Sequence, residues 1–180
     1  MLHYAGKLSH DRKEKQCESF ALQKKPMNDK TSFYELLCAQ LSALLAQETR
    51  PITIYANASA LLYHQLPDVS WAGFYLYDPT CDELYLGPFQ GKTACMHIPM
   101  GKGVCGTCAA TRQIQRVDDV HRFPGHIACD SASNAEIVLP LIKDDQLLGV
   151  LDLDSTSLAR FDEADAKGLQ QFCKELLVRL

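Results

Sequence analysis

EIVLPLIKDDQLLGVLDLD, residues 136–154, consists of two apolar runs that are joined by a short Asp-Asp turn. Apolar runs of this length on either side of a turn predict a β-hairpin. Side chains alternate between the two faces of a strand, so Asp152 and Asp154 share one face near the end of the second strand. Glu136 begins the partner strand. An acidic pocket and a solvated hairpin end account for these three acids equally well.

The segments around this hairpin predict a sheet with helices at both ends of the chain. Turn residues and apolar periodicity predict helices that begin near residues 32, 51, 104 and 161, and further strands at 71–78, 83–86, 95–99 and 113–117. A capping box, Ser32 with Glu35, opens the first helix, and Asp162 caps the last. We therefore expect an α+β fold: an antiparallel sheet of about five or six strands, with the N- and C-terminal helices packed on one face.

Composition indicates one globular domain. The chain has 180 residues, is 47% apolar and carries a net charge of −4, which argues against binding to nucleic acid. Residues 1–28 carry a net charge of +3 (six Lys and Arg against three Asp and Glu), which leaves −7 for the remainder. We expect a poorly ordered basic tail over 1–28 and a single domain over 29–180. The sequence shows no apolar segment typical of a signal peptide or a membrane span, so a cytoplasmic protein is expected.

Eight cysteines in 180 residues are too few for a disulfide scaffold, and in the cytoplasm they suggest metal binding or redox chemistry. Cys105 and Cys108, followed by His126 and Cys129, have a spacing that zinc sites use, and zinc is kept as a minority interpretation. A G-x-G-x-x-G match at residues 101–106 is rejected as a dinucleotide site because no βαβ unit follows it.

Cys129 has the most suggestive surroundings of the eight cysteines. It lies in a predicted loop that contains proline and glycine, three residues after His126 and beside Asp130. A thiol reacts as its thiolate, which His126 or Arg122 would favour and Asp130 would oppose. Composition alone therefore leaves a reactive cysteine and an inert, half-buried cysteine about equally supported.

Six motifs together resemble the free methionine-(R)-sulfoxide reductases, which have a GAF-type fold. They are WAGFY (71–75), LGPFQGK (86–92), GKGVCGT (101–107), GHIACD (125–130), EIV (136–138) and GVLDLDS (149–155). The similarity runs from about residue 32 to the C-terminus, and the order and spacing of the motifs make it specific. Cys108 departs from the family pattern, which usually has a small residue there, and this leaves open which thiol resolves the intermediate.

The resemblance implies a role for each candidate residue. Cys129 corresponds to the catalytic cysteine, Cys95 to the resolving cysteine, and Cys105 to a third cysteine that assists disulfide exchange. Trp71 corresponds to the wall that receives the substrate methyl group. The acids that line the family's substrate site correspond to Glu136, Asp152 and Asp154. No metal and no cofactor are expected.

The resemblance also implies a reaction and its partners. The substrate is free methionine-(R)-sulfoxide, which a cysteine thiolate reduces through a sulfenic acid and an intramolecular disulfide, with thioredoxin as the recycling reductant. A homodimer through the N-terminal helices is expected by analogy. The alternative is a non-catalytic GAF module that senses a ligand or the redox state, since domains of one fold serve many functions.

Overall fold

The computed structural model describes residues 29–127 and 129–180, and the tail predicted over residues 1–28 lies outside this range. The centre of the fold is a six-stranded antiparallel sheet with the strand order β3-β2-β1-β6-β5-β4. The expected α+β class and antiparallel sheet are confirmed. Within the described residues, no helix is long and apolar enough to cross a membrane.

The elements follow the predicted order. The strands are β1 (Trp71–Asp78), β2 (Glu83–Gln90), β3 (His97–Pro99), β4 (Gln115–Val117), β5 (Ala135–Lys143) and β6 (Gln146–Ser155). The helices are α1 (Lys30–Leu44), α2 (Pro51–Gln65), α3 (Gly103–Thr111) and α4 (Glu163–Leu177), with a short 3₁₀ turn, η1 (Val120–Arg122). The hairpin quoted above is β5–β6, whose strands pair from Ala135 opposite Ser155 to Lys143 opposite Gln146.

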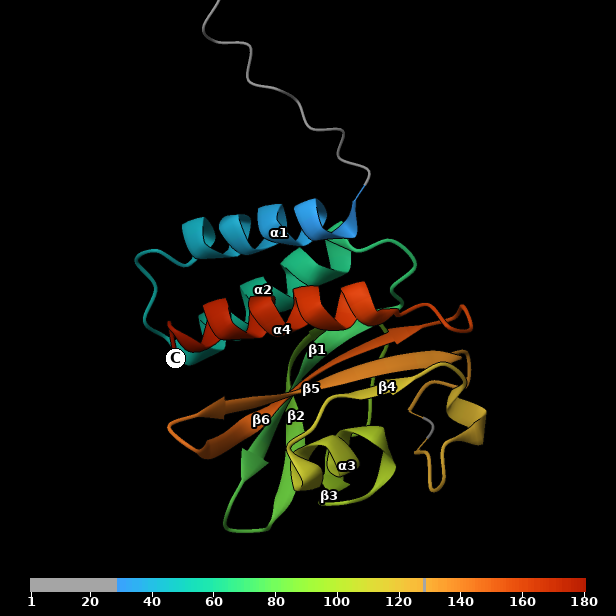
Figure 1. Ribbon diagram of the computed structural model, residues 1–180. Helices are drawn as coiled ribbons and strands as arrows, with labels where there is room; N and C mark the ends of the chain where they lie inside the picture. The colour runs from blue at the N-terminus through green and yellow to red at the C-terminus, as the bar shows by residue number, and fades with distance from the viewer. Residues whose placement is uncertain (1–28, 128) are drawn as a thin grey trace, which may run out of the picture.

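Three helices lie on one side of the sheet, and Figure 1 shows α2 and α4 next to the strands with α1 above them. The strands present alternate apolar side chains to these helices: Ala72, Phe74, Ile137, Leu139, Leu151 and Leu153. Burial of this continuous apolar layer is the main force that holds the terminal helices to the sheet. The prediction that the N- and C-terminal helices pack on one face is confirmed.

The opposite face of the sheet is covered by α3 and the long loops (Figure 1). The intervening residues of the same strands form a second apolar cluster there, which includes Trp71, Tyr75, Val138 and Val150. Because side chains alternate along a strand, the acids of β5 and β6 belong to this face and not to the helical one. This second face carries the candidate functional site.

One helix start differs from the prediction. Helix α1 is capped by Asp29, whose carboxylate accepts a hydrogen bond from the Thr31 backbone N–H, so the capping box predicted at Ser32 and Glu35 is wrong. The helix begins earlier because Asp29 already supplies an acceptor for its free N–H groups. In α4 the predicted cap is confirmed: the Asp162 carboxylate accepts a hydrogen bond from the Asp165 backbone N–H, and the Asp165 carboxylate accepts one from the Asp162 backbone N–H.

Candidate functional site

The three predicted acids meet at one end of the sheet. Asp154 of β6 lies opposite Trp71 on one side and opposite Glu136 on the other. Asp152 is two residues away on the same face. Glu136 and Asp152 are only 6% and 5% exposed, so the interpretation as a solvated hairpin end is wrong. The acids line a cavity with an interior volume of about 30 Å³, room for one or two water molecules.

Burial keeps protons on these acids. It raises the pKa of Glu136 and of Asp152 well above the ordinary carboxyl value, and the negative charges of their acidic neighbours add to the effect. Burial also raises the pKa of Asp154 to about 7, although a hydrogen bond from Ser133 acts in the opposite direction. The cluster can therefore hold protonated carboxyl groups at neutral pH, which is the state a proton donor requires.

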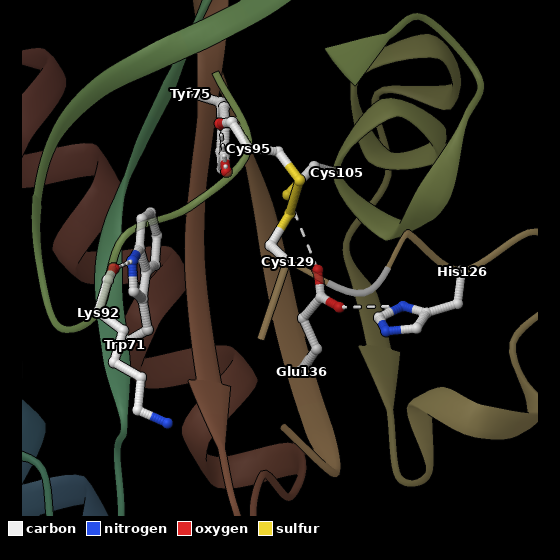
Figure 2. The surroundings of a disulfide bond; sticks show 8 residues. All are labelled: Trp71, Tyr75, Lys92, Cys95, Cys105, His126, Cys129 and Glu136. Carbon is white, nitrogen blue, oxygen red and sulfur yellow. Dashed lines mark hydrogen bonds and ion pairs between the residues drawn. A yellow bond between two sulfur atoms is a disulfide. The ribbon is translucent and has the colours of Figure 1, made fainter. Parts of the chain in front are cut away.

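Cys95 and Cys129 are joined by a disulfide (Figure 2), and Cys129 lines this cavity. Their Cα atoms are 5.5 Å apart, within the usual range for a disulfide. Cys95 belongs to the loop between β2 and β3, and Cys129 to the loop between η1 and β5. The fold thus brings together two thiols that are 34 residues apart in the chain.

Two aromatic residues of β1 hold the loop that carries Cys95. The Trp71 indole Nε1 donates a hydrogen bond to the Lys92 carbonyl at 3.1 Å, and the Tyr75 hydroxyl donates to the Cys95 carbonyl at 3.1 Å (Figure 2). The Lys92 ammonium then pairs with Asp130 at 3.0 Å, which links this loop to the one that carries Cys129. Sequence reasoning missed Tyr75 and Lys92 as site residues, although strand alternation places Tyr75 on the face of Trp71.

Trp71 forms one wall of the cavity. Its ring stacks on Phe89, with centroids 5.2 Å apart, and on Tyr75, with centroids 5.9 Å apart. Gly73 makes this stack possible, because a Cβ atom at that position would lie 2.7 Å from Cη2 of Trp71. The wall is therefore rigid and apolar, which suits a methyl group or another small apolar part of a ligand.

Cys105 lies in the first turn of α3 and lines the cavity together with Gly103 and Val104 of the same turn. Its buried thiol contacts the Glu136 carboxyl at 3.7 Å, and burial together with the neighbouring acids raises its pKa well above the ordinary value. Cys105 is thus a neutral thiol in this state, unlike an activated nucleophile.

The zinc site suggested by the cysteine spacing is not formed. Cys129 is bonded to Cys95, and the Cys108 thiol points to the Val138 carbonyl at 3.5 Å, away from the other proposed ligands. The spacing failed as a guide because it does not determine which partners the fold brings to each thiol: Cys105 contacts Glu136, whereas Cys108 contacts the Val138 carbonyl.

His126 is a further residue of the cavity. Its Nδ1 atom lies 4.0 Å from the Glu136 carboxylate, and the ring points toward that acid in Figure 2. Burial lowers the pKa of His126, and the nearby His121 lowers it further, so the imidazole is neutral at physiological pH. The cavity therefore combines an apolar wall, several carboxyl groups, an imidazole and the sulfur atoms of Cys105 and Cys129.

Comparison with known proteins gives consistent matches. The model of the GAF domain family matches residues 40–180. The chain is 55% identical to the free methionine-R-sulfoxide reductase of Escherichia coli K12 over 82% of this chain and 88% of that protein. The structure of free methionine-R-sulfoxide reductase from Neisseria meningitidis in complex with its substrate superposes with a TM-score of 0.81 at 45% identity, over 84% of this chain and 90% of that chain. The reduced form of fRMsr of Staphylococcus aureus superposes with a TM-score of 0.79 at 49% identity, over 82% of this chain and 94% of that chain.

Proposed function

Because the chain belongs to the GAF domain family and, within it, to the free methionine-R-sulfoxide reductases, we propose that it reduces free L-methionine-(R)-sulfoxide to methionine. The observation that carries the proposal is the Cys95–Cys129 disulfide, in which Cys129 lines a cavity together with Trp71 and buried acids. A disulfide at this place is the expected product of one reductive turnover. We assign the activity to the single domain over residues 29–180.

The first step is the attack of the Cys129 thiolate on the electrophilic sulfoxide sulfur. One of the buried carboxylic acids donates a proton to the sulfoxide oxygen, which makes the sulfur more electrophilic. The bond that the attack forms between Cys129 and the substrate sulfur then breaks together with the sulfur–oxygen bond of the substrate, and the oxygen passes with its proton to Cys129. Methionine leaves reduced by two electrons, and Cys129 remains as a sulfenic acid. The raised pKa values of Glu136, Asp152 and Asp154 support the presence of the proton that this step consumes.

The second step closes the disulfide. The Cys95 sulfur attacks the Cys129 sulfenic sulfur, the sulfur–oxygen bond breaks, and the oxygen leaves as water with the proton of Cys95. Cys105 stands within the same cavity and assists disulfide exchange in this scheme. An external dithiol such as thioredoxin then returns both cysteines to thiols, so a cytoplasmic location is part of the proposal.

Substrate recognition follows from the charges of the cavity. Trp71 receives the methyl group, ionised members of the acidic cluster hold the ammonium, and the free N–H groups at the start of α3 receive the carboxylate. A residue within a protein has neither charged end, which explains a preference for the free amino acid.

A homodimer through the N-terminal helices is also part of the proposal. Leu36 and Leu44 of α1 are 45% and 50% exposed, and Ile52 at the start of α2 is 64% exposed. Apolar side chains left in water on neighbouring helices support contact with a second copy of the chain.

The decisive experiment mixes the purified protein with free methionine-(R)-sulfoxide and dithiothreitol and measures methionine. We expect turnover by the wild type and a loss of at least about 1000-fold in Cys129→Ser, because removal of a nucleophile has larger effects in other enzymes. Cys81→Ser is the matched control, since Cys81 is an exposed thiol on the β1–β2 turn. Absence of product from the wild type would support the non-catalytic sensor module instead. Activity that survives Cys129→Ser would refute the assignment of Cys129 as the nucleophile.

A mass map after one turnover without reductant tests the resolving step. We expect a Cys95–Cys129 crosslink in the wild type. In Cys95→Ser, Cys129 should be trapped as a sulfenic acid by dimedone or appear in a disulfide with Cys105. A wild-type crosslink that joins Cys129 to Cys105 or Cys108 would assign the resolving role to that thiol.

A further inference from the structure

Three buried side chains converge beneath the disulfide. One potential ligand atom from each of Cys105, Glu136 and Asp152 lies within 4.8 Å of the other two. Each of the three residues is less than a tenth exposed. The Oδ1 atom of Asp152 has no hydrogen-bond partner, although the residue is only 5% exposed. A buried carboxyl oxygen without a partner is unfavourable, so this atom points to a ligand that would satisfy it.

His126 lies beside this cluster, next to the other oxygen of the Glu136 carboxyl group. Its Nδ1 is buried, has no hydrogen-bond partner and lies 4.0 Å from Oε2 of Glu136. Figure 2 shows the His126 ring and the Cys105 side chain on either side of the Glu136 carboxylate. One sulfur and two carboxylate oxygens from three separate elements, α3, β5 and β6, therefore converge, and the imidazole lines the same cavity beside them.

This donor set matches zinc. Zinc binds thiolate, imidazole and carboxylate ligands in a tetrahedral arrangement, at distances of about 2.0–2.3 Å. Ligand atoms around such an ion are somewhat less than 4 Å apart, close to the 3.7 Å between the Cys105 sulfur and Glu136. The interior of about 30 Å³ accommodates one ion. Calcium and magnesium prefer sets made only of oxygen atoms, so the sulfur favours zinc over them.

We propose that Cys105, Glu136 and Asp152 form an inhibitory zinc site that excludes the substrate, with a water molecule as the fourth ligand. The proposal rests on the proposed function, because the ion takes the carboxyl oxygens that would hold the substrate ammonium and protonate the sulfoxide. Cys105 binds as the thiolate and the acids bind as carboxylates, and the displaced protons go to solvent. Unlike the site suggested by the cysteine spacing, this one uses neither Cys108 nor Cys129, so the disulfide does not prevent it.

The binding test uses the full chain with its Cys95–Cys129 disulfide intact and no reductant, because dithiols would compete for the metal. Zinc is titrated against a chromophoric chelator, and cobalt(II) is used as a spectroscopic probe. We expect one zinc per chain and a thiolate-to-cobalt charge-transfer band. Cys105→Ser should abolish the band and weaken zinc binding by at least about 100-fold, because even the loss of residues outside the ligand shell weakens metal sites about 10–100-fold.

Two further variants make the test specific. Asp152→Asn should weaken zinc binding while the thiolate–cobalt band remains at higher cobalt concentration. Cys108→Ser is the matched control: its thiol is one turn away on α3 and equally buried, and it should bind zinc as tightly as the wild type. No zinc bound by the wild type, or equal affinity in Cys105→Ser and the wild type, would overturn the proposal. The wild-type cobalt band tests it even if Cys105→Ser fails to fold.

An activity measurement then separates this proposal from the proposed function. With a thioredoxin system of low zinc affinity as reductant, zinc should raise the apparent KM for methionine-(R)-sulfoxide and leave kcat unchanged. An active enzyme that binds no zinc would refute the zinc site alone. A protein that binds zinc through Cys105 but never reduces the sulfoxide would refute the reductase and leave a metal-binding module.

Discussion

Individual residues decide whether the chemistry of the candidate site can proceed. Asp130, next to Cys129, would oppose thiolate formation if its negative charge were unbalanced. The structure pairs it with Lys92 at 3.0 Å, and a backbone hydrogen bond from Ala132 together with the Lys92 contact lowers the pKa of Asp130. The pair leaves the surroundings of Cys129 close to neutral. The balance of charges that the sequence left open thus depends on a residue 38 positions away.

Replacement of Lys92 by methionine should therefore make Cys129 less reactive. The variant leaves the Asp130 carboxylate unbalanced beside the sulfur. Alkylation of Cys129 at pH 7 in a reduced Cys95→Ser background should slow by about two- to fivefold, the range expected for an exposed ion pair. Lys167→Met, which removes an exposed lysine on α4, is the control. Equal alkylation rates in all three proteins would argue against electrostatic help from Lys92.

Asp154 gives a second expectation at this scale, on the pH dependence of stability. Its pKa is raised to about 7 from the ordinary value of 3.8, so the folded state holds a proton that the unfolded state releases. The contribution of this group to stability is complete below about pH 4 and is lost as pH rises through about 7. Relative to Asp154→Asn, the free energy of unfolding of the wild type should therefore fall by about 1 kcal/mol per pH unit between about pH 4 and pH 7. Urea unfolding of the oxidised protein between pH 4 and 8 measures the difference, and a pH-independent difference would contradict the raised pKa.

Among the elements, β1 contributes most to the site. It pairs with β2 on one side and β6 on the other, and Trp71 and Tyr75 reach from it to the loop of Cys95. Gly73, between these two aromatic residues, lies opposite Asp152 of β6 and close to Phe89 of β2. A residue without a side chain is needed there because the aromatic stack occupies the space above it.

Gly73→Ala should therefore disturb both stability and activity. The added methyl group would lie 2.8 Å from the Phe89 Cα and 2.7 Å from the Trp71 ring, so the backbone or the ring must shift. We expect a loss of about 1–3 kcal/mol, typical of an overpacked core, and a lower kcat/KM because the Trp71 wall moves. Chemical denaturation and steady-state kinetics measure the two effects. Tyr85→Thr, at an exposed position of β2, should change stability by less than about 0.5 kcal/mol.

At the scale of the whole molecule, the disulfide couples the redox state to stability. It joins two loops on one face of the sheet across 34 residues, while the layer of α1, α2 and α4 on the other face makes no contribution to it. A crosslink of this span restricts the unfolded chain and stabilises the fold by about 4 kcal/mol through loop-closure entropy. Reduction should therefore lower the free energy of unfolding by about this amount.

Thermal unfolding tests this coupling. The Tm of the oxidised protein should lie roughly 8–15 °C above that of the reduced protein. This range combines a stabilisation of about 4 kcal/mol with a change in Tm of about 2–4 °C per kcal/mol at this chain length. Cys95→Ser is the control, because it cannot form the bond and its Tm should not respond to dithiothreitol. If the wild-type Tm also did not respond to dithiothreitol, the disulfide would not form in solution.

The fold and much of the site follow from local pattern. The alternation of Asp152, Leu153 and Asp154 placed both acids on one face, and the runs on either side of the Asp-Asp turn predicted the β5–β6 hairpin, because a strand turns successive side chains to opposite faces. Tertiary structure alone decided that the acids are buried, that Cys95 meets Cys129, and that Cys108 faces the Val138 carbonyl. Burial and contact between distant segments depend on how strands and loops pack in space, and no local spacing in the chain encodes that packing.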